Sequence, residues 1–253
     1  SELTKFHDKL ATLTFLDPAC GCGNFLVITY RELRKLEHKV LDALYGNTMG
    51  MFDIGENGVV KCDVDQMYGI EIEDFPSLIA QTALWLTDHQ MNREFSKLSG
   101  QTYKRLPLKK HANIHHANAL TTDWATVIQP QKLNYILGNP PFIGAAFKNR
   151  EQSVLVKALV NDISTLKLDF AAAWYFKSAQ IMLLNKTIRT ALVSTNSISQ
   201  GEQPAILWGK LSEYGFKIDF AHTTFRWTND AKGVAGVYCV IIGFSYKDNL
   251  NKE

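Results

Sequence analysis

Strand-like apolar runs alternate with helical patterns along most of the chain. Turn-forming residues bound each run, and this alternation is typical of a parallel sheet covered by helices. The pattern predicts a doubly wound α/β fold with a seven-stranded, mostly parallel sheet. A hairpin between the last two runs makes the last strand antiparallel. The expected strands span residues 12–17, 66–72, 112–117, 133–138, 189–194, 217–222 and 236–244.

A helix is predicted behind Asp74 and Pro76, which suit a helix cap and a first turn. Further helices are expected at about 24–45, closed by Gly46, at 168–186, and at 202–214, closed by Gly215. The polar or glycine-rich segments 46–65 and 94–111 are expected to be excursions between core elements.

The size and composition suit one large domain. The chain has 253 residues and is 46% hydrophobic, which is enough for a sizeable core. Its net charge of +2 comes from 27 basic and 25 acidic residues, so any affinity for nucleic acid must come from a local patch. We therefore expect a single domain over residues 1–253. Because the first residue is Ser rather than Met, we expect a fragment of a longer chain.

The cysteines and the hydropathy bear on the compartment. The four cysteines lack CxxC spacing and an evident disulfide framework, which indicates a reducing cytosol. No run approaches the roughly 18 apolar residues of a membrane span, and no signal-peptide pattern opens the chain. A cytoplasmic protein without a membrane partner is expected.

A glycine-rich turn follows the first expected strand, in the stretch "DPACGCGNFL". Doubly wound folds bind nucleotides at this place, and Gly21 and Gly23 let the backbone approach a ligand closely. A dinucleotide site needs a small residue where this chain has Leu26, which argues against NAD. Asp17, at the carboxyl end of the strand, suits a cationic amino group better than a pyrophosphate.

Glu71 ends the second expected strand, in "GIEIE". An acidic residue at this tip can accept hydrogen bonds from both ribose hydroxyls of an adenosine group. The alternative is a solvated strand end or a helix cap, and the residue alone does not decide between them.

The stretch "LGNPPFIG" places two prolines and an aromatic residue directly after the fourth expected strand. Proline fixes φ and cannot donate to a strand ladder, so the pair ends the strand in a stiff corner. Such stiffness suits a site that holds a small planar group, and it also suits an ordinary tight turn.

In combination, these motifs resemble those of S-adenosylmethionine-dependent DNA adenine-N6 methyltransferases. The matching stretches are Asp17–Leu26, Gly69–Glu73 and Asn139–Phe142, in that order. The segments 192–203 and 220–244 are similar to later parts of the methyltransferase regions of bacterial restriction-modification proteins, including fused enzymes of the MmeI-like type. The resemblance spans nearly the whole chain and implies a Rossmann-like methyltransferase catalytic domain. It also implies that a target-recognition region follows on the full-length chain or lies on another subunit.

The resemblance implies transfer of a methyl group from S-adenosylmethionine to the exocyclic N6 of a flipped-out adenine in double-stranded DNA, with no metal. In this interpretation the Asn139 side-chain oxygen and the Pro140 carbonyl accept hydrogen bonds from the amino group, while Pro141 stiffens the loop. Phe142 stacks on the base, and Trp227 or Phe225 supplies the second ring, with Trp227 favoured. The implied cofactor-binding residues are Asp17, Pro18, Ala19, Gly21, Gly23, Glu71, Ile72, Asn118 and Ala119.

Two details of the pattern leave room for other interpretations. Many relatives carry Asp where this chain has Asn118, and Asn can still accept a hydrogen bond from an amino group of the cofactor. Asp169, in "LDFAAAWYF", either caps a helix or faces the site, and capping is favoured.

Other functions remain open from the sequence. An Asn-Pro-Pro-aromatic loop also occurs in enzymes that methylate a glutamine amide in protein or guanine N2 in RNA. A noncatalytic module that binds DNA or a partner and retains the fold is a further alternative. A cytosine-C5 enzyme is disfavoured, because that chemistry needs a thiolate and Cys239 lies in an expected buried strand.

Overall fold

The structure, a computed structural model, describes residues 1–46, 59–100, 112–227 and 237–246. The chain divides into two compact units, Ser1–Ala117 and Asn118–Glu253, and each is described by itself. The expectation of a single domain stays a prediction. Within the described ranges no helix is both long and apolar enough to cross a membrane.

Three parallel strands form the sheet of the first unit, in the order β3-β2-β1. Asp17 pairs with Gly69, and Glu71 pairs with His116, so β1 and β2 bring the predicted acidic residues to one edge of the sheet. Gly69 has no room for a side chain, because a Cβ there would lie 2.8 Å from Cys20 Sγ. The strands are β1 (Phe15–Asp17), β2 (Met67–Glu71) and β3 (Asn113–His116), each within its predicted range.

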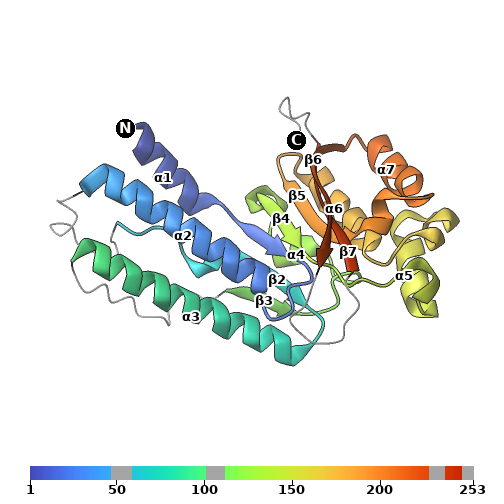
Figure 1. The fold of residues 1–253 in the computed structure, drawn as a ribbon, viewed down its shortest axis with the longest axis horizontal. Coiled ribbons are helices and arrows are strands. Elements are labelled where there is room, and N and C mark those ends of the chain that lie inside the picture. Colours follow the sequence, from blue (N-terminus) through green and yellow to red (C-terminus); the bar gives the residue numbers. More distant parts are fainter. Residues whose placement is uncertain (47–58, 101–111, 228–236, 247–253) are drawn as a thin grey trace. The chain divides into compact units, whose positions relative to one another are not determined.

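Two long helices of the first unit lie alongside each other (Figure 1). Helix α2 begins after Gly23 and ends at Gly46, as predicted. Helix α3 extends well beyond its predicted core, and the prediction of an excursion is wrong for residues 94–99, because buried Phe95 continues the apolar face of the helix. The helices are α1 (Glu2–Thr12), η2 (Val64–Gln66), α2 (Asn24–Tyr45) and α3 (Asp74–Ser99).

A buried charged network joins the three α-helices of this unit. Arg34 donates to the Asp88 carboxylate at 2.9 Å and lies 3.2 Å from Glu37 Oε2. Glu37 also accepts a hydrogen bond from the ring of His7 at 2.9 Å when Nε2 of that ring carries the proton, while Tyr30 donates to Asp88 at 2.6 Å. Arg34 and Glu37 are fully buried. Removal of one partner therefore leaves an uncompensated charge in the core.

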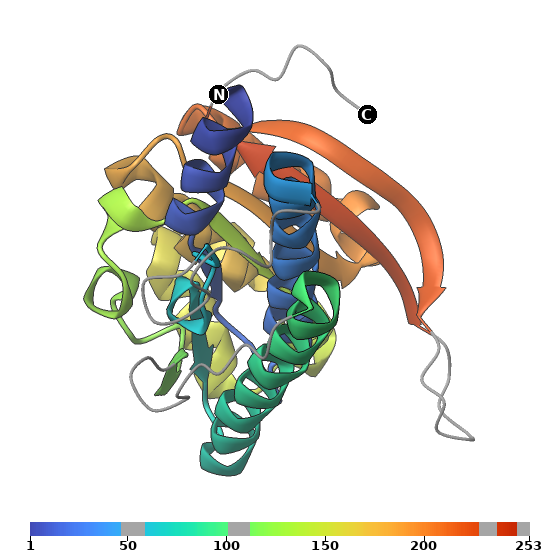
Figure 2. The same ribbon diagram turned by 90° about the vertical axis from the view of Figure 1, so that its left-hand side faces the viewer.

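Four strands form the sheet of the second unit, in the order β4-β5-β7-β6. Strand β5 runs parallel to β4 and antiparallel to β7, and β7 forms a long antiparallel pair with β6 (Figure 2). Phe220 lies over Gly243 on the neighbouring strand, where a Cβ would lie 2.1 Å from its ring. The strands are β4 (Tyr135–Gly138), β5 (Arg189–Thr195), β6 (Lys217–Trp227) and β7 (Val237–Ser245).

Helix α6 forms the core of the second unit and is buried along most of its length. Tyr175 of this helix stacks on Phe244 at 5.5 Å between ring centroids, and its hydroxyl lies 2.9 Å from Ser194 Oγ on β5. The α-helices are α4 (Trp124–Val127), α5 (Arg150–Val160), α6 (Ala172–Leu184) and α7 (Gln203–Glu213). The 3-10 helices are η3 (Pro130–Lys132), η4 (Ala145–Phe147), η5 (Ile163–Lys167) and η6 (Asn196–Ser199).

The described strands confirm the predicted α/β class. The first unit contributes three parallel strands and the second unit contributes four, in which β7 runs antiparallel to both β5 and β6. Among the described residues, three α-helices were not predicted, namely α1, α4 and α5. Ser1 caps α1, Asp123 caps α4, and a reciprocal pair of hydrogen bonds between Asn149 and Gln152 caps α5.

Candidate active site

Asp17 is a buried carboxylic acid at the carboxyl end of β1. It is 1% exposed, and its Oδ1 accepts a hydrogen bond from the Ala19 backbone N–H at 3.0 Å. Burial raises the pKa of Asp17 to about 7, and the nearby charge of Glu71 adds to this rise, while the Ala19 hydrogen bond opposes it. The side chain therefore gains most from a ligand that brings a positive charge.

The turn after β1 has the backbone that its glycines predict. Gly21 has φ +53° and Gly23 has φ +83°. Both values lie in the left-handed region of backbone conformation, which residues with a side chain rarely adopt. At Gly23 a Cβ would also lie 3.0 Å from Cβ of Ala80 on α3. The Cys20 N–H donates to the Ile70 carbonyl on β2 at 3.1 Å, which holds the turn over the neighbouring strand. Helix α2 follows without a side-chain cap.

Glu71 ties the end of β2 to this glycine turn. Its Oε2 accepts a hydrogen bond from the Gly21 N–H at 2.8 Å, and its Oε1 accepts one from the Glu73 N–H at 2.9 Å. Each carboxylate oxygen retains a further lone pair, so the group can still accept from a ribose hydroxyl. The link from Glu71 to Gly21 was missed from the sequence, since fifty residues separate them and no local pattern marks the contact.

The structure brings together most of the residues predicted to bind the cofactor in the first unit. Asp17 and Ala19 form one hydrogen-bonded pair, Gly21 and Glu71 form a second, and the charge of Glu71 acts on the Asp17 carboxyl. Ile72 follows Glu71 with 58% of its surface exposed. Pro18 lies within the same turn.

Asn118 and Ala119 belong to the second unit, so the structure does not test their predicted contact with the cofactor. Asn118 Oδ1 accepts a hydrogen bond from the Leu120 N–H at 2.9 Å, and the Ala119 carbonyl accepts one from Trp124 Nε1 at 2.8 Å. Asn118 thus already uses part of its acceptor capacity in a turn.

The segment Asn139–Phe142 follows β4 directly, because Gly138 is the last residue of that strand and pairs with Leu192 of β5. Pro140 is buried and Pro141 is exposed. The Asn139 Oδ1 atom is buried and has no hydrogen-bond partner among the described residues. An unsatisfied buried acceptor costs about 1–3 kcal/mol, so this atom favours a ligand that carries an N–H donor.

Asp169 is a further residue of this region, and the prediction that it caps a helix is wrong. Helix α6 has Ala171 at its N-cap, with no side-chain hydrogen bond there. The Asp169 carboxylate instead accepts from the Ala145 backbone N–H, from Gln203 Nε2 and from Thr195 Oγ1. It therefore fixes the chain just beyond Phe142.

The two aromatic residues predicted to supply the second ring, Phe225 and Trp227, lie in β6. We expected Thr223–Asp230 to follow the sixth strand, and this is wrong for Thr223–Trp227, since β6 continues through Trp227 with an irregular register between His222 and Phe225. Residues 228–230 lie outside the described part of the chain. Phe225 is half-buried, with its ring edge against His222 at 5.7 Å between centroids. The side chain of Trp227 lies outside the described part of the chain, so its stacking stays a prediction.

A family model described as "MmeI, DNA-methyltransferase domain" matches residues 1–253, the full length of the chain. The chain belongs to the MmeI DNA-methyltransferase domain family. Membership implies that the chemistry is methylation with a methyl donor.

Two relatives support this membership. DNA methyltransferase A of Bacillus subtilis (strain 168) is 37% identical over 257 residues, covering 100% of this chain and 29% of the relative. The type IIL restriction-modification enzyme MmeI, whose structure was solved in complex with DNA, is 52% identical with a TM-score of 0.93, covering 98% of this chain and 33% of that enzyme. The chain thus spans about a third of the length of these relatives.

A more distant protein resembles the chain in fold. The EcoKI M protein, of a type I restriction enzyme, is 16% identical with a TM-score of 0.52, covering 94% of this chain and 43% of that protein.

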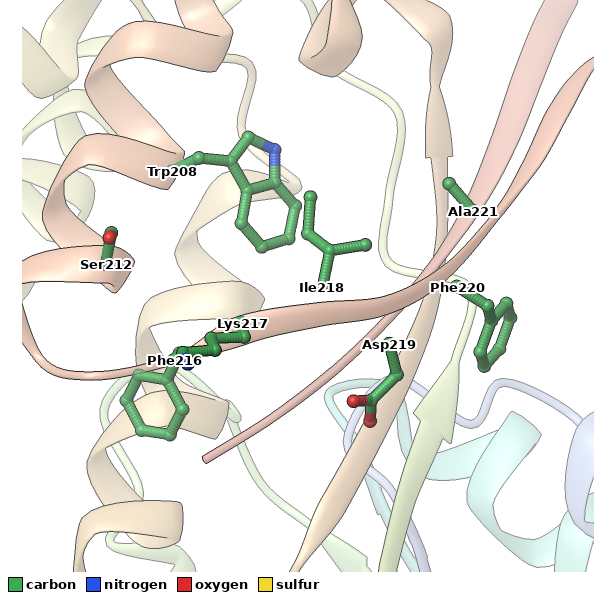
Figure 3. Close-up of a pocket in the computed structure, with 8 residues that line it drawn as sticks. All are labelled: Trp208, Ser212, Phe216, Lys217, Ile218, Asp219, Phe220 and Ala221. Carbon is green, nitrogen blue, oxygen red and sulfur yellow. The ribbon is translucent and has the colours of Figure 1, made fainter. Parts of the chain in front are cut away.

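One cavity of this MmeI-type domain lies apart from the predicted site residues. It has a volume of about 460 Å³ and lies between α7 and the first half of β6 (Figure 3). Its lining is mostly apolar, and its one carboxylate, Asp219, accepts a hydrogen bond from Ser245 at 2.9 Å. No residue predicted from the sequence to bind cofactor or substrate lines it. The residues that line it are Trp208, Ser212, Phe216, Lys217, Ile218, Asp219, Phe220 and Ala221.

Proposed function

We propose that this domain transfers a methyl group from S-adenosylmethionine to the exocyclic N6 of adenine in double-stranded DNA, as part of restriction-modification. The buried Asn139 Oδ1 carries the proposal, because it is an acceptor in a stiff loop without a partner among the described residues. An amino group is the donor that such an acceptor suits. Membership of a DNA-methyltransferase family supports the choice of DNA.

The first unit holds the methyl donor in this proposal. The Asp17 carboxylate accepts a hydrogen bond from the cationic amino group of the methionine part of the cofactor. This positive charge favours ionisation of the buried Asp17 carboxyl. Glu71 accepts from the ribose hydroxyls while it keeps Gly21 in place. Ile72 offers an exposed apolar surface to the adenine ring of the cofactor. S-adenosylmethionine, when bound, supplies an electrophilic methyl group on a sulfonium.

The loop after β4 acts on the nucleophile. The exocyclic nitrogen of adenine attacks poorly, because its lone pair is delocalised into the ring. Hydrogen bonds from this amino group to Asn139 Oδ1 and to the Pro140 carbonyl favour a tetrahedral nitrogen, which is the geometry of the transition state. Such bonds strengthen in the transition state, so they raise the rate rather than the ground-state affinity. Positioning of the two reactants supplies much of the remaining acceleration.

The target base must leave the duplex to reach this loop. Flipping costs a few kcal/mol of unstacking and unpairing, and stacking on an aromatic ring returns about 1–3 kcal/mol per base. Phe142 supplies one ring, and Trp227, or else Phe225, supplies the other. The DNA sequence is read by a target-recognition region on the full-length chain or on another subunit.

Transfer of labelled methyl groups distinguishes this function from its alternatives. The full-length protein is incubated with radiolabelled S-adenosylmethionine and, separately, with duplex DNA, ribosomal RNA or a glutamine-containing release-factor protein. Label in DNA alone supports the proposal, whereas label in RNA or protein alone contradicts it. Calorimetry with S-adenosylmethionine tests the remaining alternative, since a noncatalytic module would not bind the cofactor.

A further inference from the structure

The Asp169 carboxylate is a buried junction of three hydrogen bonds. The residue is 5% exposed. Its Oδ1 accepts from the Ala145 N–H at 2.9 Å and from Gln203 Nε2 at 3.0 Å, and its Oδ2 accepts from Thr195 Oγ1 at 2.8 Å. Gln203 also accepts from the Asp169 backbone N–H at 3.0 Å. Residues from η4, α7 and the end of β5 therefore converge on one side chain.

Both ends of the Asn139 loop, residues Asn139–Phe142, are connected to the same strand, β5. The loop begins where β4 ends, and Gly138 pairs there with Leu192 of β5. Three residues further along β5, Thr195 bonds Asp169, which in turn bonds Ala145 just after the loop. Entry to the loop is thus fixed by the β4–β5 ladder, and exit from it by the Asp169 carboxylate.

Two further contacts attach the same exit segment to the chain around Asp169. The Phe170 N–H donates to the Ile143 carbonyl at 2.8 Å. Lys148 Nζ donates to the carbonyls of Leu166 and Leu168, and burial lowers the pKa of this lysine. The carboxylate is nevertheless the one group here that links the exit segment to β5 and α7 together.

We propose that Asp169 is a positioning residue for methyl transfer, which holds Asn139 and Phe142 at the geometry that the target base requires. This inference rests on the proposed function. Asp169 acts through the loop, with no contact with the reacting atoms. Loss of its hydrogen bonds detaches the exit of the four-residue loop from β5 and α7, and a displacement of about 1 Å at a reacting centre lowers the rate about 100-fold.

The chemistry of the junction predicts which substitution preserves it. In Asp169→Asn, the amide Oδ1 can still accept from Ala145 and Gln203, while Nδ2 donates to the Thr195 hydroxyl, which can accept. Asp169→Ala removes all three bonds. Thr195→Val removes only the link to β5. A positioning role thus predicts an order for the loss of methyl-transfer rate: mild in Asp169→Asn, intermediate in Thr195→Val and severe in Asp169→Ala.

Asp162→Ala is the matched control. Asp162 also ties together elements of the second unit, because it accepts from the Ser164 N–H at 2.9 Å and pairs with Lys210 of α7 at 3.2 Å. No hydrogen bond or ion pair joins the Asp162 side chain to the Asn139 loop among the described residues. This variant therefore loses a hydrogen bond and an ion pair of the second unit without freeing the exit of the loop.

The experiment measures three properties of these variants in the full-length protein. Single-turnover methyl transfer into duplex DNA gives the rate, and calorimetry gives the affinity for S-adenosylmethionine. Hydrogen exchange of the peptide covering residues 139–147, followed by mass spectrometry, reports the mobility of the loop without any activity. We expect Asp169→Ala to lower the rate about 100-fold with cofactor affinity unchanged within about twofold, and to accelerate exchange of this peptide.

Three outcomes would overturn the inference. The first is a normal rate and normal exchange in Asp169→Ala, and the second is an equal loss of rate in Asp162→Ala. The third is an Asn variant as impaired as the Ala variant. If Asp169→Ala does not fold, Asp169→Asn and Thr195→Val decide through the same readouts. A wild-type protein that labels no DNA contradicts the proposed function, and the exchange data then still test whether Asp169 holds the loop.

Discussion

Asp17→Asn is expected to make the ligand-free protein more stable above neutral pH. The pKa of Asp17 rises from 3.8 to about 7 in the folded protein, mainly through burial. The folded protein therefore favours the protonated form of Asp17. The contribution of this form to the free energy of unfolding is complete below about pH 4 and is lost as the pH rises through about 7. Asn carries no charge at any pH, and its Oδ1 can still accept the Ala19 hydrogen bond.

The size of this effect follows from the two pKa values. The two pKa values differ by about three units, and each unit corresponds to about 1.36 kcal/mol. Ionisation of Asp17 therefore lowers the free energy of unfolding by about 4 kcal/mol at most. For a chain of this length, each kcal/mol shifts the melting temperature by about 2–4 °C. We expect Asp17→Asn to melt roughly 10 °C above the parent at about pH 8 and at nearly the same temperature at about pH 4.

Binding of S-adenosylmethionine should change in the opposite direction. A hydrogen bond between charged groups contributes about 1.5–3 kcal/mol, so the variant should bind the cofactor about 10–100-fold more weakly. In the parent, affinity should fall as the pH drops below about 7, because Asp17 is then protonated before the cation binds.

Thermal unfolding across pH, with and without cofactor, tests this reasoning. Asp8→Asn is the control, because Asp8 is an exposed acid of the same unit whose pKa is lowered by Lys61. This variant should gain no stability at alkaline pH. Equal melting temperatures of the parent and Asp17→Asn at about pH 8, or a difference that does not vary with pH, would refute the account of Asp17.

Three further substitutions test other parts of the molecule. Glu71→Ala should weaken S-adenosylmethionine binding by about 1–3 kcal/mol in calorimetry, and unchanged affinity would remove Glu71 from the cofactor site. Asn139→Ala should lower the single-turnover rate with little effect on cofactor affinity, so a normal rate in the full-length protein would exclude the proposed mechanism. Arg34→Met should reduce the free energy of unfolding by about 3–5 kcal/mol in denaturant titrations, because Glu37 and Asp88 lose their buried cation; an undiminished value would contradict this.

The strands and the long helices could be predicted because burial imposes a period on their sequences. The apolar alternation fixed the positions of seven strands to within a few residues, except in β6. In the second half of β6, the polar residues Thr224 and Arg226 are exposed, so this stretch does not read as a buried strand although it pairs with β7. Helix α5 lacks a long apolar face, so no hydrophobic period predicted it. The sequence feature that could have predicted this helix is the capping pair of Asn149 and Gln152 at its start.

The contacts that organise the candidate site could not be predicted in the same way. The hydrogen bonds from Gly21 to Glu71 and from Thr195 to Asp169 join residues that are far apart in sequence. Neither contact follows from a local period or from a motif. Asp169 precedes α6 closely enough to suggest a helix cap, and only the tertiary structure shows that its carboxylate instead bonds Ala145, just after the Asn139 loop.

Identification of the methylated nucleoside tests the central claim most directly. The full-length protein is incubated with duplex DNA and S-adenosylmethionine, and the DNA is then digested to nucleosides. The nucleosides are separated and identified by mass spectrometry, and the Asn139→Ala variant is the control. The account predicts N6-methyladenine in the wild-type reaction and little or none with the variant. Methylation of cytosine, or N6-methyladenine formed equally well by Asn139→Ala, would contradict it.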